Sequence, residues 1–287
     1  MSVIAILTDS GVSLPEPLLK ELNIKTVAYY IHRGQEVLRD LVTIQRDDFI
    51  RWLETAKALP KSASPGPGDY IEAYQEMADQ GATDIVSIHM TSLASGAFQA
   101  AQVAKSMALE QMPQVNIEVI DTRNTALCQG WMVVEAARLA QAGKSLEEIV
   151  AKVKKMIPVT RMILTADTLK YLYMGGRIGK AQRLVGSLLN IKPLIGMEDG
   201  VIVPLGTERS RPKAYQAMVN LVERAVGKAG KIKIAYVHAG ALEEAKKVRE
   251  LFEPRLTVVE FMFAELSPAL ALHSGPGTVG VCYYPVE

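Results

Sequence analysis

The stretch Asp84-Ile85-Val86-Ser87-Ile88-His89-Met90 runs directly into Thr91-Ser92-Leu93-Ala94-Ser95-Gly96, so a short apolar segment ends in a hydroxyl-rich turn. A helical pattern follows that turn. The same succession begins at residues 3–7 and again at residues 115–120. Strands that alternate with helices at this spacing indicate βαβ units around a parallel sheet. We therefore predict an α/β fold whose N-terminal three-layer domain has a parallel sheet, with ligands bound at the carboxyl ends of its strands.

The second half of the chain has a different pattern, in which a hairpin precedes alternating helices and strands. Glu198-Asp199-Gly200 separates two apolar runs at residues 191–197 and 201–205, which is typical of a hairpin. We predict a C-terminal α/β domain with a mixed sheet and place the boundary near residue 160, giving domains at 1–160 and 161–287. The other elements expected in this domain are helices at 213–226 and 242–251 and strands at 231–238, 256–263 and 278–284.

Composition excludes several classes of protein. The chain has 287 residues, a length typical of two domains. Its 32 basic and 31 acidic residues give a net charge of +1, so no global field favours nucleic acid or an anionic membrane. Two cysteines, Cys128 and Cys282, are too few for a disulfide framework. The apolar run at residues 1–7 is too short for a signal peptide, and no charge-free run is long enough to span a bilayer. We expect a soluble, cytoplasmic protein with no stable membrane insertion.

Motifs for cofactor or metal chemistry are weak. Residues 275–280 match the dinucleotide pattern G-x-G-x-x-G, but only seven residues follow Gly280, and they have the pattern of a strand instead of the required helix. The four histidines, His32, His89, His238 and His273, lack the spacing of metal ligands. No G-x-S-x-G nucleophile elbow is present. We predict no cofactor, no metal and no catalytic residue.

Two hydroxyl-rich turns are candidate anion sites. The first, at residues 61–70, precedes a predicted helix and is also compatible with a plain loop and helix cap. The second, at residues 91–99, lies between a strand end and a helix start, where free amide N–H groups and the helix dipole favour a carboxylate or phosphate. Ordinary capping is the alternative interpretation there as well.

A third candidate segment is basic. No acidic residue lies between Asp167 and Glu198. This segment could dock an acidic partner or a phosphate, and it could equally be a solvated face. Its five cationic side chains are Lys170, Arg177, Lys180, Arg183 and Lys192.

Taken in order, these segments resemble the DegV family of bacterial fatty-acid-binding proteins, over nearly the whole chain. Ser62-Ala63-Ser64-Pro65-Gly66-Pro67-Gly68 is similar to the family's T-S-Q-P-S-P-G turn, and Ser92-Leu93-Ala94-Ser95-Gly96-Ala97-Phe98-Gln99 to its S-G-L-S-G-T-Y-Q stretch. The other matching segments are Thr8-Asp9-Ser10, residues 167–169, 171–172, 175–179 and 188–193, and His273-Ser274-Gly275-Pro276-Gly277.

The resemblance implies a function and a set of site residues. It implies that one long-chain, palmitate-like fatty acid lies between the two domains, and that the protein runs no reaction itself. A separate ATP-dependent kinase subunit would receive the carboxylate and form the acyl phosphate. By position, Ser62 and Ser95 would bind the carboxylate, Ser92 and His273 would be secondary neighbours, and Arg177 would lie near the kinase partner. The departures from the family pattern are Ala63, Gly66 and Leu93-Ala94.

Burial of an acyl chain agrees with that function. A chain of about 16 carbons gains roughly 0.8 kcal/mol per buried methylene, or roughly 12 kcal/mol before association costs. Such a ligand needs an apolar tunnel and one modest anion site, which hydroxyls beside helix-end amides can provide. Two other functions stay open on the sequence alone. One is an enzyme that acts on a small phosphorylated or carboxylated substrate, and the other is an acyl-dependent regulatory protein.

Overall fold

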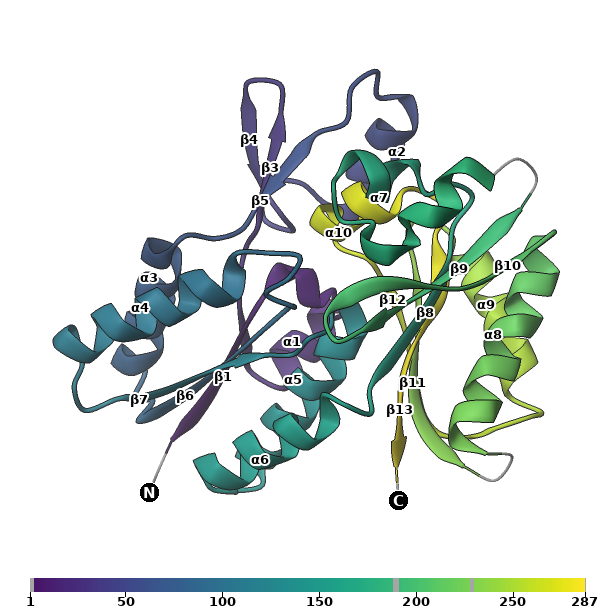
Figure 1. Cartoon of the computed structure of the whole chain (residues 1–287). Helices are drawn as coiled ribbons and strands as arrows, with labels where there is room; N and C mark the ends of the chain where they lie inside the picture. Colours follow the sequence, from purple (N-terminus) through teal and green to yellow (C-terminus); the bar gives the residue numbers. More distant parts are fainter. Residues whose placement is uncertain (1–2, 188–190, 228–229, 287) are drawn as a thin grey trace.

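A computed structural model describes residues 3–187, 191–227 and 230–286. The segment at 188–193, part of the resemblance above, therefore falls partly outside the described residues. Three of the four N-terminal strands were predicted, and all neighbours in their sheet pair in parallel, which confirms the parallel sheet (Figure 1). In sheet order the strands are β2 (Ile24–Val27), β1 (Ile4–Asp9), β6 (Asp84–His89) and β7 (Asn116–Asp121).

Helices cover both faces of this sheet, as a three-layer domain requires. Strand β6 is buried at every position, as expected for a central parallel strand covered on both sides. The helices α3 (Pro67–Asp79) and α4 (Ala97–Gln111) lie on one face, and α5 (Ala126–Gln141) and α6 (Leu146–Met156) on the other. Shorter helical segments connect these elements: η1 (Ser10–Val12), α1 (Glu16–Glu21) and α2 (Arg46–Thr55).

A small antiparallel sheet, which was not predicted, projects from the N-terminal half (Figure 1). It has the order β4 (Glu36–Arg39), β3 (Tyr30–Arg33), β5 (Lys61–Ala63). Gly34 has a φ of +64° in the two-residue turn that joins β3 to β4, a conformation that glycine adopts without strain. Ser62 pairs with Ile31 of β3, so it lies on a strand and not in the turn that the sequence suggested.

The C-terminal half has a six-stranded mixed sheet, as predicted. Only β11 and β12 pair in parallel, and every other neighbouring pair is antiparallel. The predicted hairpin is confirmed, since Asp199 and Gly200 both take positive φ between β9 and β10. In sheet order the strands are β10 (Val201–Glu208), β9 (Lys192–Glu198), β8 (Arg161–Thr165), β13 (Val279–Val286), β11 (Lys231–His238) and β12 (Thr257–Glu265).

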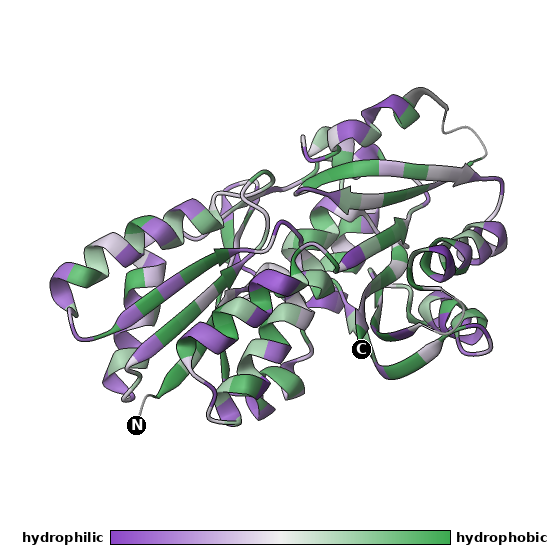
Figure 2. Ribbon diagram, turned by 60° about the horizontal axis from the view of Figure 1, so that its bottom comes forward, coloured by the Kyte–Doolittle hydropathy of each residue, from purple (hydrophilic) through white to green (hydrophobic). Residues whose placement is uncertain are grey.

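Helices cover one face of this mixed sheet, and the N-terminal half lies against the other. The helices α8 (Arg211–Val226) and α9 (Leu242–Phe252) pack on the outer face over a hydrophobic cluster of their own. On the inner face, Trp131 of α5 donates its indole N–H to the carbonyl of Cys282 at 3.1 Å. A single large cluster of buried apolar side chains continues from one half into the other. The strands between the helices are mostly hydrophobic (Figure 2).

The predicted domain boundary near residue 160 falls in the connection between α6 and β8. Three short helical segments lie over the junction of the two halves: α7 (Lys170–Met174), η2 (Gly179–Ser187) and α10 (Pro268–Ser274). Within residues 3–187, 191–227 and 230–286, no helix is both long and apolar enough to cross a membrane.

Candidate functional site

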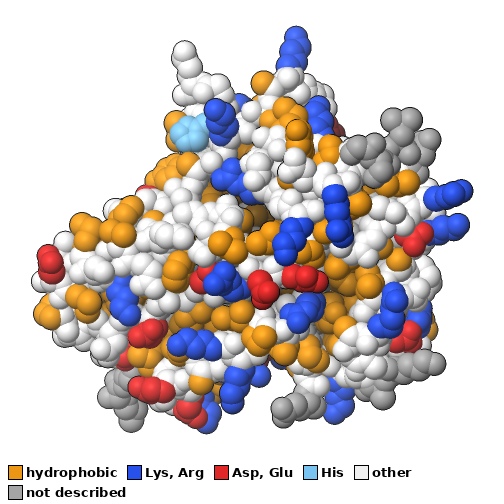
Figure 3. Space-filling model, viewed as in Figure 1, with side chains coloured by type: hydrophobic (Ala, Val, Ile, Leu, Met, Phe, Trp, Pro, Cys, Tyr) orange, Lys and Arg blue, Asp and Glu red, His pale blue; other side chains and the backbone are white. Residues whose placement is uncertain are grey.

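A cavity of about 340 Å³ lies between the two halves of the molecule. Apolar side chains from both halves form most of its wall. In the view of Figure 3, the surface is hollowed near its centre, and Lys and Arg side chains lie beside the hollow. Apolar residues that contribute to the wall include Met90, Met162, Leu164, Ile195, Met197 and Leu266.

Ser62 and His273 meet at the wall of this cavity. Their Oγ and Nε2 atoms are 2.8 Å apart, although 211 positions separate the two residues in the chain. Ser62 comes from β5 and His273 from α10, so the contact joins the two halves. Burial, and then the positive charge of Arg177, lower the pKa of His273 to about 4. The imidazole is therefore neutral at pH 7, and its Nδ1 has no hydrogen-bond partner among the described residues.

Ser95 and Tyr29 form a second polar contact at the cavity wall. The Oγ of Ser95 and the hydroxyl of Tyr29 are 2.5 Å apart, and Ser95 Oγ also accepts the N–H of Ala97 at 3.2 Å. Ser95 lies two residues before Ala97, the first residue of α4, where the helix dipole favours an anion. Burial, and then the charge of Asp9, raise the pKa of Tyr29, so its hydroxyl stays protonated at neutral pH. Tyr29 was not predicted as a site residue, because its place at the site depends on a contact with a residue 66 positions away.

The two contacts belong to one polar cluster, which we define as Tyr29, Ser62, Ser64, Ser95 and His273. All five line the cavity. The link between them is the approach of Ser64 to Gly96, where a Cβ atom would lie only 3.1 Å from Ser64 Oγ. Hydroxyl groups and one neutral imidazole thus gather on a mainly apolar wall, to which Thr125, Ser274 and Thr278 also contribute.

Arg177 lies at the edge of the same cavity and is exposed. Its Nη1 donates to the carbonyl of Gly175 at 2.7 Å, and its Nε donates to the carbonyl of Ala94 at 3.3 Å. No ion pair to Arg177 is found in the part of the chain that the structure describes. Close packing explains why one position of the glycine-rich segment, Gly175, has no side chain: a Cβ there would lie 2.4 Å from Nδ1 of His273.

Ser92 is not brought to the polar cluster. It is absent from the described cavity wall, and its backbone N–H donates to Oδ2 of Asp121 at 3.3 Å. Of the basic segment, Lys192 forms an ion pair with Asp167 at 2.5 Å. Arg211 shares the same carboxylate at 2.6 Å. The remaining members of the segment, Lys170, Lys180 and Arg183, are exposed.

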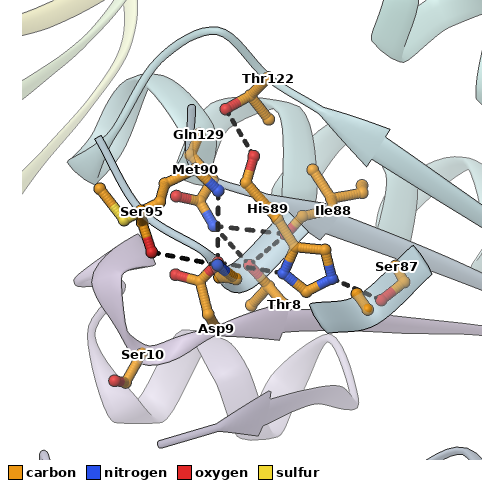
Figure 4. Close-up of polar contacts among 12 residues, drawn as sticks. Thr8, Asp9, Ser10, Ser87, Ile88, His89, Met90, Ser95, Thr122 and Gln129 are labelled. Carbon is orange, nitrogen blue, oxygen red and sulfur yellow. Dashed lines mark hydrogen bonds and ion pairs between the residues drawn. The ribbon is translucent and has the colours of Figure 1, made fainter. Parts of the chain in front are cut away.

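A chain of polar contacts lies beneath the cavity, in the core of the N-terminal half (Figure 4). Asp9 Oδ2 lies 3.1 Å from Nδ1 of His89, whose Nε2 lies 2.6 Å from the Oγ of Ser87. All three side chains are fully buried, and none of them belongs to the cavity wall as described. The same Asp9 oxygen accepts the N–H of Met90, which does line the cavity. This chain holds together the carboxyl ends of β1 and β6.

The described residues contain no group of three or more His, Cys, Asp or Glu side chains that could hold a metal ion. A family model described as "Uncharacterised protein, DegV family" matches residues 3–286. The chain belongs to the DegV family.

Relatives and solved structures agree with this assignment. A DegV domain-containing protein of Halalkalibacterium halodurans is 32% identical over 286 residues, which is 99% of each chain. A DegV-family structure from Thermus thermophilus, described by its fatty acid binding, has a TM-score of 0.91 at 29% identity and 99% coverage of each chain. DegV of Bacillus subtilis, described as a fatty acid binding protein, has a TM-score of 0.88 at 28% identity and 100% coverage of each chain.

Proposed function

We propose that this chain binds one long-chain fatty acid in the cavity between its halves and presents the carboxylate to a separate ATP-dependent kinase subunit, which forms the acyl phosphate. The observation that carries the proposal is a mainly apolar cavity wall that also holds the polar cluster. Fatty acids combine the same two properties, a long apolar chain and one anionic end. Two DegV relatives described as fatty acid binding share this fold over nearly their whole length.

The carboxylate would bind at the polar cluster. Because His273 is neutral, its Nε2–H can donate to Ser62 Oγ, which leaves the hydroxyl proton of Ser62 for a ligand oxygen. Ser95 would donate to the other oxygen beside the positive end of the α4 dipole. These donors are neutral, so they hold a carboxylate without surrounding it by fixed charge. Ser92 stays a predicted neighbour for which the cavity wall offers no support.

Presentation to the kinase would involve Arg177 at the edge of the cavity. Its guanidinium contacts only main-chain carbonyls in the described structure, and its positive charge helps to lower the pKa of His273. A planar guanidinium can hold phosphate oxygens through two parallel hydrogen bonds. We therefore assign Arg177 to the contact with the partner or with the developing acyl phosphate. Binding of the fatty acid itself would rest on the polar cluster and the apolar wall.

Extraction of the purified protein tests the binding function. We expect denaturation and organic extraction, followed by mass spectrometry, to release about one long-chain fatty acid per chain. Delipidated protein should take up added palmitate to the same stoichiometry. If no acyl species is extracted and no fatty acid is taken up, the proposed function is wrong.

A further inference from the structure

Asp40 is a buried carboxylate that touches both halves of the molecule. Its side chain is 1% exposed and accepts two hydrogen bonds. Ser10 Oγ, just after β1, donates to Oδ2 at 2.6 Å. The backbone N–H of Ala269, in the first turn of α10, donates to Oδ1 at 3.1 Å. One side chain thus ties the end of a central N-terminal strand to a helix of the C-terminal half.

The first of these bonds leads to Tyr29. Ser10 Oγ accepts the backbone N–H of Tyr29 at 3.0 Å, and the N–H of Asp40 donates to the carbonyl of Tyr29 at 2.9 Å. Both polar groups of the Tyr29 backbone are therefore fixed by Asp40 or by its partner. The side chain of Tyr29 in turn contacts Ser95 in the polar cluster.

The second bond leads to His273. Ala269, Leu270, His273 and Ser274 of α10 all line the cavity, and this helix has only seven residues. A helix this short depends on its tertiary contacts for its position. The bond from Ala269 to Asp40 anchors its first turn, one helical turn before His273. Asp40 therefore contacts the supports of both polar pairs, Tyr29 with Ser95 and Ser62 with His273.

We propose that Asp40 is a positioning residue that sets the spacing of the two polar pairs, and with it the preference of the cavity for a carboxylate. This inference rests on the proposed function. A carboxylate suits the role because it offers an acceptor oxygen to each of two donors. Burial raises the pKa of Asp40 to about 6, against the opposing effects of its hydrogen bonds and of Arg46. A residue needed only for packing would not require such a costly buried acid.

The test compares two ligands of equal chain length, palmitic acid and 1-hexadecanol. The alcohol fills the apolar part of the cavity and lacks the carboxylate. We expect wild-type protein to prefer the acid, and Asp40→Ala to lower acid affinity about tenfold while alcohol affinity changes about twofold or less. Asp40→Asn should have an acid affinity between those of wild type and Asp40→Ala, because the asparagine carbonyl still accepts the Ala269 N–H while its amide faces Ser10.

Asp84→Asn is the matched control. Asp84 is also buried and also accepts hydrogen bonds from a hydroxyl and an amide, those of Thr83 and Asn116. It lies at the amino end of β6, whereas the polar chain and Met90 lie at the carboxyl end. Its substitution should leave the ratio of acid to alcohol affinity unchanged. If Asp40→Ala does not fold, Ser10→Ala and Asp40→Asn provide the test. Ser10→Ala removes only the hydrogen bonds that connect Asp40 to Tyr29, and it should still lower the ratio of acid to alcohol affinity.

Two outcomes would overturn the positioning role while leaving the proposed function intact. One is an equal loss of acid and alcohol in the Asp40 variants, which is the mark of a structural role alone. The other is a ratio that stays at the wild-type value in Asp40→Asn and Ser10→Ala. Wild-type protein that binds neither ligand would instead overturn the proposed function, and this inference with it.

Discussion

One histidine–serine pair is buried in the core of the N-terminal half, and another faces the cavity between the two halves. The pair of His89 and Ser87 is completed by Asp9, so it has the order carboxylate, imidazole, hydroxyl, but all three groups are fully buried. The pair of His273 and Ser62 faces the cavity, but Nδ1 of its imidazole has no partner among the described residues. The complete set has no access to a ligand, and the accessible set is incomplete.

This difference separates two uses of the same chemistry. In the buried pair, the hydrogen bonds satisfy polar groups that would otherwise be costly in the core, and they fix the ends of β1 and β6. In the cavity pair, an imidazole without an orienting carboxylate and with a pKa of about 4 is a poor general base at neutral pH. Such a pair is better suited to hold a carboxylate than to attack one. Four experiments can break or sharpen this contrast.

The largest effect is expected from His89→Ala. Its removal leaves Asp9 and Ser87 buried without their shared partner, so the free energy of unfolding should fall by about 3–5 kcal/mol. Urea denaturation measures this change. His32→Ala is the control, because His32 is exposed on β3 and its loss should cost little. A fall as small as that of the control would show that the buried chain does not stabilise the fold.

Ser62→Ala should have the opposite profile, with weaker ligand binding and nearly unchanged stability. Loss of one hydrogen bond to a charged oxygen should lower fatty acid affinity by about 1.5–3 kcal/mol. Ser95→Ala should behave similarly, and the double variant should lose less than the sum if both serines bind one carboxylate. Calorimetric titration with palmitate measures these affinities, with exposed Ser106→Ala of α4 as the control. Unchanged affinity in both single variants would move the carboxylate elsewhere.

A pH series should show that His273 is buried in its neutral form. Its native pKa of about 4 lies below the ordinary value of 6.5, so between these values the unfolded chain binds more protons. Stability is therefore lost as the pH falls. The difference in unfolding free energy between wild type and His273→Gln should shrink by about 2 kcal/mol from pH 7 to pH 5. Asp40 titrates with the opposite sign, and the subtraction removes its contribution.

His238→Gln provides a matched comparison for that series. Burial also lowers the pKa of His238 to about 4, but this residue is not part of the described cavity wall. The two variants should show similar pH dependence of stability, and only His273→Gln should alter fatty acid affinity. A difference for His273→Gln that stays constant from pH 7 to pH 5 would contradict the neutral, buried imidazole.

The fold was predictable from the sequence where local patterns decide it. Strand β6 with its hydroxyl-rich turn and the Asp199-Gly200 hairpin both carry a local signal that the structure confirms. The small sheet was missed, because β5 has only three residues and is stabilised by pairing with β3, about 30 positions earlier. Its one local signal was Gly34, which makes the two-residue turn.

The site was predictable only in part, because its contacts join distant segments. Ser62, Ser95 and His273 were named from the family resemblance, and the structure places all three at one cavity. The resemblance did not include Tyr29 or Asp40, and nothing local distinguishes either residue. Each contributes through partners that folding alone brings near, Ser95 for Tyr29 and the α10 helix for Asp40.

The smallest change in binding is expected from Arg177→Ala, which separates holding the ligand from passing it on. Because the guanidinium donates to main-chain carbonyls, those of Ala94 and Gly175, and to no side chain among the described residues, fatty acid affinity should change about twofold or less. Phosphorylation supported by a kinase subunit should fall about tenfold or more, and Arg177→Lys should restore little of it, since an ammonium cannot form the bidentate contact. Arg224→Ala, an exposed arginine on α8, is the control. Affinity and melting temperature should be measured on one preparation, because a joint loss of both would mean that Arg177 braces the two halves and does not serve the partner.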